Sequence, residues 1–353
     1  MWERDCGRAI HVRPGFLIDR PGALSKQSIQ CIFKETRLED TAMAHDALSQ
    51  VLDALKLRGS IYFHTHFSPP WGVRVPAYGR VARFHMALRG ECWLRVQGTA
   101  KPLRLATGDL AVIPHGAEHI LSDTPDRDAI DVDEVVQRSG YAGHGALVYG
   151  DPDENLACKL FCGHFEFDEG TLHPILQSLP DVIHVPNTQS MNAYWLESML
   201  RFVSAEITAD RAGSEAIIHR LSEIVFIQVI RTFVDKVGDD AGSLAAVLHP
   251  QFGRCLSKVH AAPEEHWTVE TMASEAGMSR TVFAERFSSL MGMTPLNYVT
   301  HWRMQQARRK LIDTEQPLIE IAEGVGYGSE AAFSRAFKRQ FDVTPGELRR
   351  HAH

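Results

Sequence analysis

Seven histidine and cysteine side chains in the front half of the sequence could do chemistry together. They lie in short stretches of alternating apolar and polar residues, and they are His64, His66, His85, Cys92, His119, Cys162 and His164. His64 and His66 share one face of a strand, because successive side chains alternate along β-structure. Imidazole and thiolate groups that converge from several strands can hold a divalent transition metal such as zinc. The alternative is that they are hydrogen-bonded core or rim residues.

The same region is open to two other interpretations. Cys92 and Cys162 could be oxidation sensors, provided that they are accessible and have lowered pKa values, whereas buried cysteines would be inert. Trp93 and the histidines could instead line a pocket for a small organic effector. No apolar run reaches the length of a membrane span, no secretion signal opens the chain, and the six cysteines form no regular framework. We therefore expect a cytoplasmic protein that binds no membrane.

The rear of the sequence holds a different kind of chemistry, in a pattern that occurs twice. In the stretch 272–295, Ala273, Gly277 and Ser279 are followed by apolar residues at helical spacing, and the same pattern returns about fifty residues later. Glycine can take a positive φ in a tight turn, and serine caps the helix that follows. The pattern predicts two tandem helix-turn-helix units.

The free face of each second helix carries side chains that could read DNA. The predicted contact residues are Ser279, Arg280, Thr281 and Glu285 in the first unit, and Ser329, Glu330, Ala331, Ser334, Arg335 and Lys338 in the second. Arg335 is the strongest candidate, because arginine can bond bidentately to guanine. A long helix over Leu296–Ile312 would fix the two readers so that they enter successive major grooves, about 34 Å apart. The alternative is an ordinary helical bundle.

The second copy of the pattern is contained in PLIEIAEGVGYGSEAAFSRAFKRQFDVTPGELR, which begins at Pro317. This stretch resembles the signature of the AraC/XylS family of transcriptional regulators. The resemblance covers the last hundred or so residues and implies sequence-specific binding to double-stranded DNA, with control of the transcription machinery. Carried over by position, it places Thr281, Glu285, Glu330, Ala331, Ser334 and Arg335 where base contacts are made.

The stretch from Gly108 to His119 fits the second motif of the cupins, a glycine, five residues, Pro-x-Gly, two residues and a histidine. Gly90 resembles the glycine that closes the first cupin motif. The usual His-x-His and glutamate of that first motif are not in place, and Arg83 stands where the glutamate should be. Roughly residues 46–185 therefore resemble the cupin-type sensory domains found ahead of AraC-type DNA-binding domains. The resemblance implies a jelly-roll barrel that senses a signal, and it does not imply catalysis.

The candidate residues are positioned by an α+β multidomain chain, which we divide into four successive segments. The segments are an extension at 1–44, a cupin-like sensory domain at 45–186, a helical linker at 187–242 and a DNA-binding domain at 243–353. We read 123–145 as an acidic loop and 238–243 as the linker into the last segment. The helices expected over Met191–Ile207 and Glu215–Val237 have excess apolar surface, which predicts a homodimer. The alternative is packing against the barrel.

The charge distribution agrees with this division. The whole chain carries a net charge of −7, but the part from His249 onward has 13 basic and 12 acidic residues. Basic clusters at 308–310, 338–339 and 349–350 could neutralise phosphates, although each could also be solvated helix surface.

The sequence thus predicts a transcriptional regulator whose cupin-like domain senses a small molecule, a metal or a redox signal. The alternative is a cupin-type metal-dependent enzyme with an accessory helical domain. A purely architectural DNA binder would leave the barrel unexplained. The sequence shows no nucleophile–base constellation and no phosphate-binding loop, so we expect no enzymatic activity.

Overall fold

The computed structural model describes residues 46–352 apart from 80, 144, 151–156, 168–172, 188–194, 196–197, 200, 204 and 207–210. The chain divides into two units, Met1–Ala44 and His45–His353, and only the second is described. The extension expected at 1–44 therefore lies outside the described residues, and so does much of the helix expected over Met191–Ile207.

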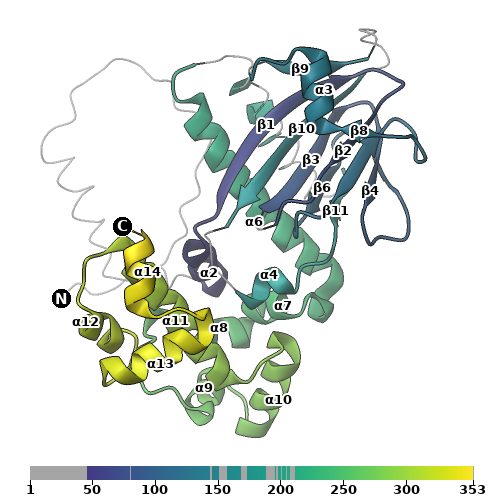
Figure 1. The fold of residues 1–353 in the computed structure, drawn as a ribbon. Coiled ribbons are helices and arrows are strands. Elements are labelled where there is room, and N and C mark those ends of the chain that lie inside the picture. Colours follow the sequence, from purple (N-terminus) through teal and green to yellow (C-terminus); the bar gives the residue numbers. More distant parts are fainter. Residues whose placement is uncertain are drawn as a thin grey trace, which may run out of the picture. The chain divides into compact units, whose positions relative to one another are not determined.

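The front half is built from two β-sheets, as expected for a cupin-type domain (Figure 1). In spatial order, the first sheet contains β11 (Ile183–Val185), β6 (Leu110–Ile113), β3 (Val81–Arg89), β10 (Cys158–Glu166), β1 (Arg58–Phe67) and β9 (Ala146–Tyr149). The second contains β5 (Leu103–Leu105), β4 (Cys92–Val96), β7 (His119–Ser122), β2 (Gly72–Val75) and β8 (Ile130–Asp131). Buried side chains from both sheets, such as Leu160 and Leu121, form one core cluster between them.

The alternation of side chains along β3 decides which residues face that core. Ala87 joins the cluster between the sheets, whereas Phe84 and Met86 belong to the cluster on the opposite face. Because the alternation has a period of two, Arg83 and His85 lie on the same face as Ala87. On the neighbouring strand β10, Cys162 is the register partner of His85.

The stretch 123–145 is not the loop that the sequence predicted. It contains β8, which pairs with β2, and helix α3 (Val132–Ser139), and β9 follows it directly. Val132 and Val136 pack against the core between the sheets, and Val135 is fully buried. Their helical spacing is present in the sequence, but the acidic residues between them hide it.

Helix α6 (Ser214–Val237) packs on the face of the first sheet that points away from the second. Residues of α2 (Ala47–Leu55), α4 (Pro174–Gln177) and α7 (Ser243–Leu248) join the same core cluster. Phe226 of α6 packs on Phe165 of β10, with ring centroids 4.9 Å apart. The segment 238–243, which the sequence indicated as the linker into the last domain, forms a 3₁₀ turn at Gly238–Ala241 and then begins α7, and Ala241 and Leu244 are fully buried.

The rear half is helical and has the expected order of elements. It consists of α8 (Pro250–Ala261), α9 (Val269–Glu275), α10 (Arg280–Met291), α11 (Pro295–Asp313), α12 (Leu318–Glu323), α13 (Glu330–Phe341) and α14 (Pro345–Ala352). The long helix α11 buries Tyr298 and Trp302 in one core cluster and Ala307 and Leu311 in another. One continuous helix therefore ties both helical units together. Among the described helices, none is both long and apolar enough to cross a membrane.

Candidate nucleic-acid interface and effector cavity

The two helix-turn-helix units have the turns and caps that the sequence predicted. Gly277 and Gly326 adopt φ values of 65° and 83°, which only glycine takes without strain. The hydroxyl of Ser279 accepts a hydrogen bond from the backbone N–H of Val282 at 3.4 Å, and that of Ser329 accepts one from the N–H of Ala332 at 3.3 Å. Each cap starts a twelve-residue helix, α10 in the first unit and α13 in the second.

The phenylalanines of each reader helix are buried, and the opposite face is free. Phe283, Phe287, Phe333 and Phe337 have no exposed surface. The exposed side chains on the other face are Ser279, Arg280, Thr281 and Glu285 in the first unit, and Ser329, Glu330, Ala331, Arg335 and Lys338 in the second. Ser334 is half-buried. The structure thus places the predicted contact residues on two exposed surfaces that begin at helix N-termini.

The charges on these surfaces are not equally available. The Arg280 guanidinium lies 2.5 Å from the carboxylate of Glu270, so part of its charge is already neutralised. Arg335 is exposed and forms no ion pair within the described part of the chain. Arg286 was not among the predicted contact residues, but it is also exposed on α10, with its guanidinium 5.6 Å from the ring centre of Phe252. In the sequence, only its positive charge could have marked Arg286 as a DNA contact.

The three basic clusters differ in what they can do. Arg308 is only 8% exposed, and Arg309 lies 3.6 Å from the carboxylate of Asp313. Arg349 donates to the backbone carbonyl of Gln316 at 2.6 Å. Lys338 and Arg339 are both exposed on α13, so they are the pair best placed to meet phosphates.

In the front half, the structure brings together three of the seven candidate side chains. His85 Nδ1 lies 3.1 Å from Cys162 Sγ, and His85 Nε2 lies 2.7 Å from His119 Nε2. His119 Nδ1 must donate to the carbonyl of Ala117, 2.8 Å away, because a carbonyl can only accept. It follows that a neutral His85 donates a hydrogen bond through Nε2 and accepts one from the Cys162 thiol through Nδ1.

The hydrogen-bonded chain Cys162–His85–His119, called the relay below, carries no charge. Burial lowers the pKa of His85 well below its usual range and that of His119 to about 4. Burial also raises the pKa of the Cys162 thiol. Every ring nitrogen and the thiol then have a partner, which is the condition under which buried polar groups stabilise a core.

The other four candidates lie elsewhere. His64 packs on Phe161 with ring centroids 5.2 Å apart, so His64 and His66 occupy the face of the sheet opposite to His85. His164 Nε2 lies 2.8 Å from the Glu166 carboxylate. The thiol of Cys92 is hydrogen-bonded to Cys158, and this bond together with burial raises its pKa. Cys92 and Cys162 therefore lack the access and low pKa that an oxidation sensor needs.

The relay does not have the geometry of a three-ligand metal site. His85 presents opposite ring nitrogens to Cys162 and His119, so the three side chains cannot converge on one ion as they stand. Among the described residues, no group of three or more His, Cys, Asp or Glu side chains is placed to hold a metal. A metal in this domain stays a prediction from the sequence.

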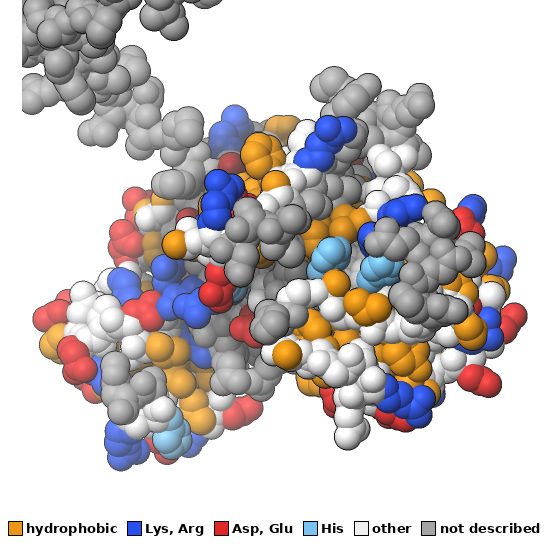
Figure 2. All heavy atoms as spheres, turned by 90° about the horizontal axis from the view of Figure 1, so that it is seen from above, with side chains coloured by type: hydrophobic (Ala, Val, Ile, Leu, Met, Phe, Trp, Pro, Cys, Tyr) orange, Lys and Arg blue, Asp and Glu red, His pale blue; other side chains and the backbone are white. Residues whose placement is uncertain are grey.

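A cavity of about 160 Å³ opens beside the relay, between the two sheets. Its apolar wall is formed by Phe67, Val73, Val75, Leu121 and Leu147, and its polar groups include Thr65, Arg83, His85 and Cys162. Trp93, the aromatic residue that the sequence suggested, is not part of the lining. On the face shown in Figure 2, hydrophobic side chains lie among basic, acidic and histidine side chains.

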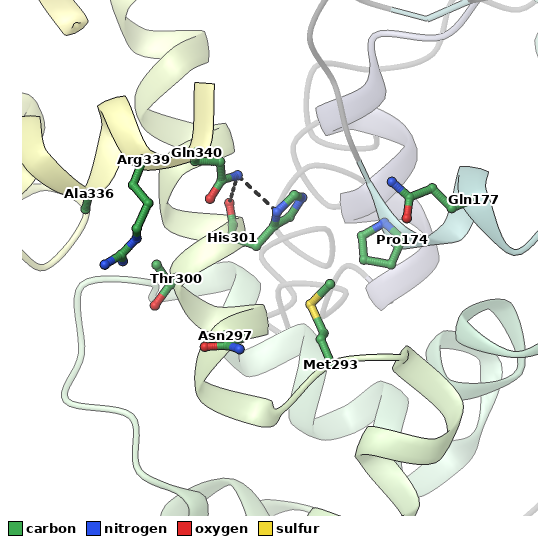
Figure 3. Close-up of a pocket in the computed structure, with 9 residues that line it drawn as sticks. All are labelled: Pro174, Gln177, Met293, Asn297, Thr300, His301, Ala336, Arg339 and Gln340. Atoms are coloured by element: carbon green, nitrogen blue, oxygen red, sulfur yellow. Dashed lines mark hydrogen bonds between the residues drawn. The ribbon is translucent and has the colours of Figure 1, made fainter. Parts of the chain in front are cut away.

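A larger and more open groove of about 580 Å³ lies beside the connecting helix (Figure 3). Asn297, Thr300 and His301 of α11 line it together with Arg339 and Gln340 of α13 and with Pro174 of α4. The amide of Gln340 donates to His301 Nδ1 at 3.0 Å. Because this groove is wide open to solvent, it resembles a surface between packed helices more than a ligand pocket.

The chain joins a domain of two sheets with an internal cavity to two capped helix-turn-helix units held on one helix. This arrangement is that of a DNA-binding transcriptional regulator. Comparison with known proteins agrees: the cupin family matches residues 46–235, and a helix-turn-helix domain matches residues 272–351. The chain belongs to the AraC family of regulators, in the group that carries an amino-terminal cupin-type domain.

Several curated relatives extend over nearly the whole chain. The HTH-type transcriptional regulator AlkR of Acinetobacter baylyi is 32% identical over 87% of this chain and 100% of its own. A protein of Streptomyces lividans named as an AraC-like transcription regulator is 33% identical over 87% of this chain and 98% of its own. The HTH-type transcriptional regulator MtrA of Neisseria gonorrhoeae is 27% identical over 86% of this chain. These relatives are regulators, so the alternative of a cupin enzyme is set aside.

Proposed function

We propose that the chain reads one specific duplex sequence with both helix-turn-helix units at once, and that a small molecule bound in its cupin-type domain controls this reading. The observation that carries the proposal is the pair of exposed, serine-capped reader helices packed on one continuous helix. A rigid connection of this kind fixes the spacing of the two reader helices, which they need in order to enter adjacent major grooves.

A selection experiment with purified full-length protein tests the reading. From a pool of random-sequence duplexes, we expect enrichment of a motif with two elements whose centres are about one helical turn apart. Enrichment of a single short element would mean that only one unit reads bases. No enrichment at all, with binding that depends only on salt, would contradict sequence-specific recognition.

A second copy of the chain is the partner that best fits the exposed apolar surface of the helical region. Phe202, Ile217 and Ile224 are 60%, 44% and 42% exposed, and the two isoleucines are seven residues apart on one face of α6. Burial of this face in a homodimer would remove it from water. Sedimentation at micromolar concentration is the test, and a monomer under those conditions would contradict the dimer.

Control by the effector would act through a shift of population. An effector that binds one arrangement of the cupin-type domain more tightly favours that arrangement, and with it one presentation of the readers to DNA and to the transcription machinery. Titration of DNA affinity against candidate effectors measures this coupling. If the affinity for DNA is the same with and without each bound effector, control by a ligand is contradicted, whereas DNA binding is not.

A further inference from the structure

We propose that Glu285 and Arg335 select opposite bases, a cytosine in the first DNA element and a guanine at the same position of the second. The two elements are therefore unlike, and the protein binds its duplex in one direction only. This inference rests on the proposed function, because it names the bases that one residue of each reader helix selects.

Glu285 and Arg335 occupy the same position in two equivalent helices. Helices α10 and α13 are both twelve residues long, and each begins directly after a serine N-cap, so both side chains belong to the sixth helical residue. The phenylalanines two residues before and two residues after that position are buried in each helix. At about 100° of rotation per residue, a side chain midway between them points directly away from the core. Both side chains therefore lie in the middle of the exposed reader face.

The first residues of the two helices also carry opposite charges, but the fold itself accounts for these. Arg280 forms an ion pair with Glu270, 2.5 Å away. Glu330 lies in the first turn of α13, where the helix dipole stabilises a carboxylate. No contact with a base is needed to explain either charge.

The fold does not account for the charges of Glu285 and Arg335 in this way. The four residues that lie three and four positions from Glu285 along its helix are all uncharged. Around Arg335 the same four positions hold two alanines and two cations, Lys338 and Arg339. Neither side chain forms an ion pair within the described part of the chain. Both charges are therefore available to meet the duplex.

The major groove offers a different base to each charge. The guanidinium of arginine donates to O6 and N7 of guanine, whereas a carboxylate can only accept, and the N4 amino group of cytosine donates. Adenine also has an amino group, but its N7 acceptor lies beside that group and repels a carboxylate. When the two equivalent helices enter their grooves in the same way, Glu285 meets cytosine on the strand where Arg335 meets guanine. The base pair at this position is thus reversed between the two elements.

Reversal of each charge tests the assignment in the full-length protein. Fluorescence anisotropy measures binding to the selected duplex and to variants that differ only at this base pair of one element. We expect the wild type to prefer cytosine over guanine in the first element by about fivefold or more. Glu285→Arg should reverse that preference, and Arg335→Glu should change guanine to cytosine in the second element. An unchanged preference in either variant would overturn the inference.

The matched control is Asp235→Arg, which makes the same change of net charge at an exposed position of α6, outside both helix-turn-helix units. It should leave the preference at both base pairs unchanged. If Asp235→Arg alters the preference as much as Glu285→Arg does, the effect comes from net charge and Glu285 does not select a base.

Two milder substitutions test whether the positions are equivalent. Glu285→Gln and Arg335→Gln keep a polar side chain at an exposed helical site, and glutamine bonds bidentately to N6 and N7 of adenine. Both variants should therefore prefer adenine, each at its own base pair. A preference for different bases in the two elements would show that the helices enter their grooves differently, which contradicts the reversed base pair.

The inference and the proposed function can fail separately. A selected motif of two elements whose bases do not depend on residues 285 and 335 would uphold the reading by both units and overturn the inference. Binding to DNA without any selected motif would overturn both.

Discussion

Arg335 is the side chain on which we expect the reading of the second DNA element to depend most. It lies on the exposed face of α13, near the capped end, and it is not neutralised by an ion pair within the described residues. We expect Arg335→Ala to weaken binding to the selected duplex by about 1–3 kcal/mol and to relax the preference at one base pair. Fluorescence anisotropy with the selected duplex and its single-base variants measures both effects.

The control for this loss is Arg220→Ala, which removes one exposed positive charge from α6, far along the chain from the readers. It should leave both affinity and preference unchanged. If Arg335→Ala instead weakens binding to every duplex equally and reduces the salt dependence, Arg335 contacts a phosphate and not a base.

The buried histidines give the protein a predictable response to acid. The pKa is lowered by burial to about 4 in His119 and to about 3 in His260, and His85 and His173 are shifted in the same direction. Between an unfolded-state pKa of about 6.5 and these values, the unfolded chain binds protons that the folded chain does not. Stability is therefore fully present above about pH 6.5 and is lost as the pH falls below it, by up to about 1.4 kcal/mol per pH unit for each group.

Urea unfolding at pH 7.5 and at pH 5.5 measures this response, and the midpoint should be lower at pH 5.5. His260→Gln should reduce the difference between the two midpoints. His164→Gln is the control, since His164 is partly exposed and lies beside a carboxylate. A midpoint that does not change between the two values would mean that the histidines are charged in the folded protein.

At the scale of elements, the two turns look equivalent in sequence but differ in how tightly they are enclosed. A Cβ on Gly277 would meet nothing closer than 3.6 Å, whereas a Cβ on Gly326 would lie 2.8 Å from Arg303 Nη2 and 2.9 Å from the carbonyl of Glu264. Arg303 cannot easily move, because it donates to the carbonyls of Pro263 at 2.6 Å and Glu265 at 2.8 Å. The second turn should therefore be the less tolerant one.

Gly277→Ala should cost about 1–2 kcal/mol of stability from the positive φ alone. Gly326→Ala should cost more, because it adds the contact with Arg303. Thermal unfolding of the two variants gives the comparison, with Gly346→Ala as the control, since that glycine has open space around it. An equal loss in the two turn variants would show that Arg303 moves aside.

Which elements the sequence could predict follows from how local their signals are. The caps and turns around Ser279 and Ser329 depend on neighbours within four residues, so the helices of the rear half were predicted closely. The strands of the front half were found from alternation, but β9 and β8 pair in parallel with strands distant in sequence. Nothing local to those short segments indicates their partners.

The candidate site in the front half shows the same limit. Alternation placed His64 and His66 on one face, and they do share one, but no local pattern says which face of a sheet points toward its partner sheet. That choice depends on packing, which puts Thr65 at the cavity and His64 against Phe161. Arg83 was noticed because it stands where a cupin glutamate was expected, and its place in the cavity came only from the structure.

At the scale of the whole described unit, one buried hydrogen-bonded cluster joins helices of the front half to helices of the rear half. The hydroxyl of Tyr298 in α11 lies 2.7 Å from His260 Nε2 and 3.3 Å from His173 Nε2. His260 Nδ1 in turn lies 3.1 Å from the amide oxygen of Gln50 in α2. The ring of His260 also stacks on Trp302, with centroids 3.8 Å apart. A change in α2 or in the segment before α4 can therefore reach the helix that carries both readers.

Tyr298→Phe tests this connection without touching a reader side chain. Loss of the hydroxyl leaves two buried imidazoles without their partner, so we expect a destabilisation of about 1–3 kcal/mol. We also expect a change in affinity for the selected duplex, because α11 sets how the two units are held. The control is Tyr327→Phe, a half-buried tyrosine that packs on Phe333 in the second unit. If Tyr298→Phe lowers the unfolding temperature but leaves DNA affinity and its response to a bound effector unchanged, the cluster only stabilises the fold, and control must pass through other contacts such as the Lys56–Asp313 ion pair.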